Sequence, residues 1–171
     1  MTSTRFFLFL AAILLSLPFV SCEGDNMGAN GSFSYTVSGA ASASVSGENP
    51  TTGSLNGVFS IGLNSNPDEL TIRIIIDPLV EGTYNINPEF VNGNVLPLVE
   101  RDATAELGIG SSLGGGRQSF NTASADGGTV TISKVSDSEI EGSFSISMME
   151  LLSGTPPHPK VQVSGEFKAK R

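Results

Sequence analysis

Apolar and polar residues alternate along most of this chain, and the alternation is clearest from residue 128 to residue 169. Three runs there, 128–134, 139–149 and 160–169, repeat with a period of two, which is typical of a strand with one buried face. Strands with one dry and one wet face predict an antiparallel sheet that packs against an apolar layer. The apolar positions of these runs are Val130, Ile132, Ile140, Phe144, Ile146, Met148, Val161, Val163, Phe167 and Ala169.

The same period predicts earlier strands over 32–38, 41–47, 55–63, 70–76 and 82–86, with further strands near 104–109 and 117–120. In the strand over 55–63 we expect Leu55, Phe59, Ile61 and Leu63 to point inward. The polar, Gly- and Pro-containing segments 47–53 and 64–69 are predicted loops. Prolines interrupt 87–101, which we interpret as an extended connection, and at most one helical turn is expected, over 148–152.

These elements predict an all-β fold after an N-terminal signal peptide. We expect an antiparallel β-sandwich, or a partly closed barrel, of about nine or ten short strands. A sandwich is favoured, because the proline-broken middle resembles a connection between two sheets.

A local pattern recurs at Gly57-Val-Phe59, Gly82-Thr-Tyr84, Gly142-Ser-Phe144 and Gly165-Glu-Phe167. An aromatic side chain two residues from a glycine lies on the same strand face and can cover neighbouring backbone that glycine leaves bare. The copies are irregularly spaced, so they predict a packing device in the core and no solenoid.

The N-terminus carries a targeting signal. Arg5 precedes residues 6–20, which are apolar except for Ser16 and Pro18, and this stretch is too short for a comfortable membrane span. Cys22 is the single cysteine of the chain and directly follows the apolar stretch. Its position resembles the lipobox of bacterial lipoproteins, although Phe19 stands where leucine is usual.

The alternative for Cys22 is a free thiol left after ordinary signal cleavage. A lone thiol invites intermolecular pairing in an oxidising compartment, and Phe19 does not suit the small-residue rule of the ordinary signal peptidase. We therefore predict lipidation at Cys22, a signal peptide over 1–21, a flexible tether over 22–31 and a single domain over 32–171. The predicted location is the outer membrane, on its periplasmic or surface side.

Charge narrows the choice of partners. The formal net charge is -8 and the isoelectric point is about 4.5, which argues against nucleic acid because phosphate binding needs a basic patch. It also argues against adsorption to anionic lipid through side chains. The membrane partner is expected to be reached through acylated Cys22.

Candidate catalytic groups are sparse. His158 is the single histidine and lies among three prolines, and there is no G-x-S-x-G motif to supply a nucleophile. Paired carboxylates, as in glycoside hydrolysis, occur at Asp77 with Glu81 and at Glu139 with Glu141, but exposed acidic turns look the same. We predict no catalytic residue.

No cofactor and no metal is predicted either. One histidine and a lipidated cysteine leave no zinc site of the usual nitrogen and sulfur type. Oxygen ligands alternate at Asn64, Asn66, Asp68 and Glu69, yet the glycine and the terminal glutamate of a calcium loop are missing. The Gly-rich segment 108–117 lacks the P-loop pattern and is interpreted as a mobile loop.

A family resemblance combines three of these features: the cysteine at position 22, Gly82-Thr-Tyr84, and the stretch from Gly128 to Phe167. Together they resemble an uncharacterised family of small all-β lipoproteins from Bacteroidetes-type bacteria. The resemblance implies an all-β fold and an envelope location, and it carries no catalytic residue over to this chain.

Two functions remain open. The first is a lipid-anchored cell-envelope lipoprotein that displays a non-catalytic β-sandwich as a binding or structural module, with a glycan, a peptide or a protein as its ligand. The alternative is a lipocalin-like barrel that carries a small hydrophobic ligand. That barrel would need an apolar cavity on the order of several hundred Å³.

Overall fold

The computed structural model describes residues 31–76, 78–86, 90–91, 94–95, 102–110, 116–122, 127–150 and 158–171. Within these residues the chain forms thirteen strands and no helix, which confirms the all-β prediction. The first six are β1 (Gly31–Gly39), β2 (Ala43–Glu48), β3 (Thr51–Leu55), β4 (Val58–Ser65), β5 (Asp68–Ile74) and β6 (Gly82–Ile86). The others are β7 (Phe90–Val91), β8 (Asn94–Val95), β9 (Ala103–Ile109), β10 (Gln118–Asn121), β11 (Gly127–Val135), β12 (Glu139–Glu150) and β13 (Lys160–Lys170).

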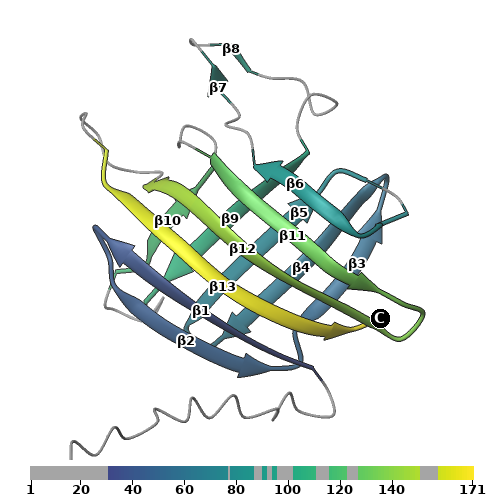
Figure 1. The fold of residues 1–171 in the computed structure, drawn as a ribbon. Helices are drawn as coiled ribbons and strands as arrows, with labels where there is room; N and C mark the ends of the chain where they lie inside the picture. Colours follow the sequence, from purple (N-terminus) through teal and green to yellow (C-terminus); the bar gives the residue numbers. More distant parts are fainter. Residues whose placement is uncertain are drawn as a thin grey trace, which may run out of the picture.

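Eleven strands belong to one sheet, in the order β2-β1-β13-β12-β11-β6-β9-β5-β4-β3, and β10 pairs with both β12 and β9. The sheet folds over on itself into two layers (Figure 1). Strands β2, β1, β13, β12, β11 and β6 form the layer nearer the viewer, and β9, β10, β5, β4 and β3 form the layer behind it. The strands of the two layers cross steeply in this view.

The two sides of this two-layered structure are joined in different ways. On one side β12, β11, β6, β9 and β10 form a closed ring of five strands, in which β6 meets β9 in parallel at Ile86 and Ala103. On the other side β2 and β3 are the two ends of the sheet order, and the chain bends between them at Asn49, with φ of 57°, and passes through buried Pro50 from one layer to the other. The structure therefore combines the predicted sandwich with the predicted partly closed barrel.

The hairpin formed by β3 and β4 corrects two expectations. Part of the loop predicted over 47–53 is strand, since β2 runs to Glu48 and β3 starts at Thr51. The strand predicted over 55–63 is wrong at its start, because Asn56 and Gly57 turn the chain with φ of 52° and 78°, as a two-residue hairpin loop requires. Leu55, expected to point inward, is consequently 74% exposed.

Other boundaries differ by smaller amounts. The loop predicted over 64–69 shortens to two residues, since β4 runs to Ser65 and β5 starts at Asp68. The helical turn predicted over 148–152 is wrong for 148–150, which belong to β12; 151–152 lie outside the described residues. The connection predicted over 87–101 also lies largely outside them, apart from the two-stranded ribbon of β7 and β8.

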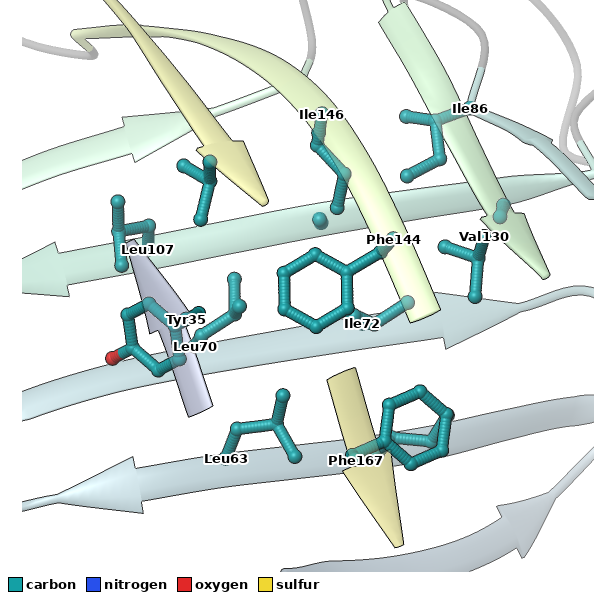
Figure 2. Packing of buried hydrophobic residues seen from close by; sticks show 14 of the residues in the cluster. Tyr35, Leu63, Leu70, Ile72, Ile86, Leu107, Val130, Phe144, Ile146 and Phe167 are labelled. Carbon is teal, nitrogen blue, oxygen red and sulfur yellow. The ribbon is translucent and has the colours of Figure 1, made fainter. Parts of the chain in front are cut away.

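Side chains from both layers fill the interior (Figure 2). Every apolar position named above for the three C-terminal runs is at most 5% exposed. The opposite layer contributes Phe59, Ile61, Leu63, Leu70, Ile72, Ile74, Ala103, Ala105, Leu107 and Phe120, which are likewise at most 5% exposed. Burying one large apolar side chain contributes about 1.5–3 kcal/mol, so this shared core is the main source of stability.

Two of the Gly-x-aromatic repeats pair with each other inside this core. In the register of β12 and β13, Gly142 lies opposite Phe167, and Phe144 lies opposite Gly165. A Cβ atom on Gly142 would lie 2.7 Å from Cζ of Phe167 and 2.5 Å from the carbonyl oxygen of Thr131. The ring of Phe167 thus covers Gly142 of the neighbouring strand, which fits the packing role predicted for the repeat. At Gly165 the nearest atoms belong to Ser34 and Tyr35 of β1.

We expect Gly142→Ala to destabilise the fold by about 1–3 kcal/mol, because the added methyl group must displace a ring and a backbone carbonyl. Gly53→Ala is the matched control: Gly53 lies in exposed β3 and has no atom within 4 Å of a built Cβ, so its effect should stay within about 0.5 kcal/mol. Urea unfolding of both variants measures the difference. Equal stabilities for the two would contradict the ring-over-glycine packing.

Candidate functional site

The outer face of the six-strand layer is covered by side chains that carry hydroxyl groups. The register of the strands places six residues side by side in one row across β2, β1, β13, β12, β11 and β6: Ser44, Thr36, Ser164, Ser145, Thr129 and Asn85. The adjacent row consists of Ser46, Ser34, Glu166, Ser143, Thr131 and Thr83. We call these two rows the hydroxyl face; all of its members except Asn85 and Glu166 carry a hydroxyl group.

A hollow of about 250 Å³ lies on this face over β2, β1 and β13. The hydroxyl groups around it belong to Ser34, Thr36, Ser44, Ser46 and Ser164. The hollow exists because these side chains are short, so that the strands beneath them are not covered by long polar chains.

Several hydroxyl groups of the face are held by their neighbours. Thr36 and Ser164 share a hydrogen bond of 3.3 Å between their hydroxyl oxygens, and Thr83 and Thr131 share one of 3.1 Å. Nε2 of Gln162, just beyond the face, donates to Oγ of Ser145 at 3.0 Å. These contacts fix side-chain positions before any ligand arrives, which lowers the entropy cost of binding.

The outer face of the second layer carries charged side chains of both signs. Arg73 pairs with Glu106 across β5 and β9, with Nη1 and Oε1 at 2.9 Å. Arg117 pairs with Glu69, and its guanidinium group lies over Gly108, where a Cβ atom would collide with it. A shallow hollow of about 180 Å³ lies among these side chains, but the charged groups already neutralise one another.

A third cluster consists of four charged side chains at the turn between β11 and β12. A β-bulge between Ile132 and Lys134 shifts the register, and this turns Lys134 out toward the solvent instead of into the core. Lys168 of β13 lies 2.7 Å from Glu139 and 3.1 Å from Glu141, atom to atom, and Lys134 contacts the same two carboxylates.

The two lysines of this cluster strongly lower the pKa of the Glu139 carboxylate. Hydrogen bonds from Lys134 and then from Lys168 lower the pKa of Glu139 to about 2. The same bonds, first to Glu139 and then to Glu141, raise the pKa of both lysines above the ordinary value. Glu139 and Glu141, named above as a candidate acid pair, are thus held in an ion-pair network. The lowered pKa of Glu139 is the opposite of the raised pKa that a general acid needs.

The other sequence candidates do not converge. Oδ1 of Asp68 accepts a hydrogen bond from the backbone of Gly110 at 3.0 Å, whereas Glu69, the next residue, pairs with Arg117. Oε1 of Glu81 accepts from the backbone N–H of Val135 at 3.1 Å, and Asp77 lies outside the described residues. His158 is half-buried just before β13.

Cys22 and the segment 1–21 also lie outside the described residues, so lipidation stays a prediction. In the part of the chain that the structure describes, no three His, Cys, Asp or Glu side chains gather closely enough to hold a metal ion. The same part contains no helix long and apolar enough to cross a membrane.

Two polar side chains in the interior differ in how they are satisfied. Thr122 is 2% exposed, and its hydroxyl group accepts a 3.1 Å hydrogen bond from the backbone of Ala105. Tyr35 is equally buried, but its hydroxyl group has no hydrogen-bond partner among the described residues. Burial, reinforced by the carboxylates of Asp68 and Glu69, raises the pKa of Tyr35, and Figure 2 shows its oxygen pointing away from Phe144.

Sequence reasoning did not single out the hydroxyl face. It gave each C-terminal strand one wet face, but it did not connect the polar residues of one strand with those of its neighbours. The available signal was the repeated polar positions in Ser-Phe-Ser-Tyr-Thr at 32–36 and Ser-Phe-Ser-Ile-Ser at 143–147. Comparison of the chain with protein-family models, with curated proteins and with solved structures gives no match.

The Glu139 cluster predicts a specific acid response. The folded-state pKa lies below the ordinary value of 4.5, so ionised Glu139 stabilises the fold above that pH, and the contribution is lost as the pH falls toward about 2. We expect the urea midpoint of the Glu139→Gln variant to lie below that of the wild type at neutral pH. Near pH 2 the two midpoints should come close together.

Urea titrations across this pH range measure the effect. Glu166→Gln removes an exposed carboxylate of the same layer that lies outside the cluster. It serves as the control and should lower the urea midpoint at neutral pH less than Glu139→Gln does. A difference between wild type and Glu139→Gln that stays constant from neutral pH to about pH 2 would contradict the assigned ion pairs.

Proposed function

We propose that this chain is a lipid-anchored envelope protein that displays a non-catalytic β-globule as a binding module. The observation that carries the proposal is the contrast between its apolar interior and its hydroxyl face, in which Glu166 is the one charged residue. Side chains of both layers pack together in the described interior, and the hydroxyl-lined hollow opens on an outer surface. The hydroxyl face is an outer surface that offers many hydrogen-bonding groups without internal charge pairing.

The positions of the ionisable groups support a role without catalysis. Glu139 and Glu141 are engaged with Lys134 and Lys168, and Glu69 is engaged with Arg117. A general acid or base needs a shifted pKa near the working pH and access to a substrate, whereas the pKa of Glu139 is shifted to about 2. The carrier alternative is less well supported, because bulky apolar side chains of both layers pack against one another in the described interior.

The short distance along the chain between Cys22 and β1 supports the anchor. Residues 22–30 precede β1, and this stretch spans at most roughly 30 Å when fully extended. Strand β1 begins at Gly31, which pairs with Ala169 close to the C-terminus. An acyl chain on Cys22 would hold that end of the globule near the membrane, since each buried CH₂ group contributes about 0.8 kcal/mol and two or more chains anchor firmly.

Metabolic labelling with a palmitate analogue in bacterial cells tests the anchor. We expect the wild type and Ser21→Ala, which keeps a small residue before the cysteine, to be labelled and to partition with membranes. Cys22→Ala should be unlabelled, because it removes the single thiol of the chain. Equal labelling of Cys22→Ala, or an unlabelled wild type with a free thiol, would refute the anchor.

A further inference from the structure

We propose that the ligand of the hydroxyl face is a neutral polysaccharide chain, bound over β2, β1 and β13 with the 250 Å³ hollow at its centre. The inference rests on the proposed function and gives the binding module a ligand class.

Charge is the first argument. The whole chain carries a formal net charge of -8, but Glu166 is the one charged member of the two rows that form the hydroxyl face. An anionic polymer would meet the repulsion of the whole protein. A cationic polymer would find the carboxylates of Glu69, Glu106 and Glu139 already paired with arginine or lysine side chains. Apart from Glu166 the face is uncharged, and an uncharged ligand fits it best.

The second argument is the type of recognition that the face allows. None of its twelve positions holds an aromatic residue, methionine or arginine, which are the residues that dominate protein–protein hot spots. Each serine or threonine hydroxyl offers one donor and two acceptor positions. Such a surface recognises a partner that is itself rich in hydroxyl groups, through many hydrogen bonds.

The third argument is geometric. Neighbouring strands lie about 4.8 Å apart, and residues two apart on one strand lie about 6.7 Å apart. Ser44, Thr36 and Ser164 therefore form a regular row across three strands, and Ser46 and Ser34 continue the array beside it. The hollow between these side chains lets an extended sugar chain lie close to the sheet instead of on top of long polar side chains.

Affinity electrophoresis tests the proposal, with the mature chain run through gels that contain dextran, glucomannan, xyloglucan, starch or the anionic polymer alginate. We expect retardation by at least one neutral polysaccharide, none by alginate, and no change when sodium chloride is raised through physiological ionic strength. Ser164→Glu and Ser46→Glu place a charge in the hollow and should weaken binding about tenfold or more.

Ser54→Glu is the matched control. It makes the same change at an exposed position of β3, in the other layer, and should bind like the wild type. Should Ser164→Glu fail to fold, Ser46→Glu on strand β2, at one end of the sheet order, carries the test. No retardation in any neutral gel, retardation by alginate alone, or equal binding by the Ser46→Glu and Ser54→Glu variants would each overturn the proposal.

A photo-crosslinking residue at position 164 separates this inference from the function on which it rests. Attachment of carbohydrate to that residue in cells supports the polysaccharide. Attachment of a protein to the same residue refutes the polysaccharide and leaves a binding module standing. If the wild type is not labelled in the palmitate experiment, the lipid anchor of the proposed function is refuted. Retardation of the mature chain in the gels would be unaffected, so the two failures can be told apart.

Discussion

Strand register is the constraint on which the rest of this structure depends. Period-two alternation within one strand gives that strand a dry and a wet side, but a continuous core needs neighbouring strands to be aligned so that their dry sides coincide. In β1, β13, β12 and β11 this alignment holds along most of each strand. A slip of one residue in any of them would move its apolar side chains to the solvent and its serines into the core.

One register therefore produces the inner and the outer chemistry at the same time. Inside, it sets Phe167 on Gly142 and Phe144 beside Gly165. Outside, it sets Ser164 beside Thr36 and Ser145. The proposed binding surface is thus not an addition to the fold, because a change that disturbs the core alignment would also break up the hydroxyl rows.

The sequence predicted what depends on neighbours along the chain and missed what depends on distant partners. The apolar positions of the C-terminal strands and the bounds of β6 followed from local alternation. The Asn56-Gly57 turn was a local signal that was overlooked, and Leu55 was misplaced as a result. The hydroxyl rows and the pairing of Lys168 with Glu139 join strands whose register no local pattern reveals.

Cysteine scanning of β12 tests this shared register most directly. In a Cys22→Ala background, single cysteines replace Ser143, Phe144, Ser145 and Ile146 in turn, and the reaction of each with a water-soluble maleimide is timed in the folded protein. The account predicts fast labelling at 143 and 145 and protection at 144 and 146, where the native side chains are 5% and 0% exposed. Uniform labelling, or the opposite alternation, would contradict it.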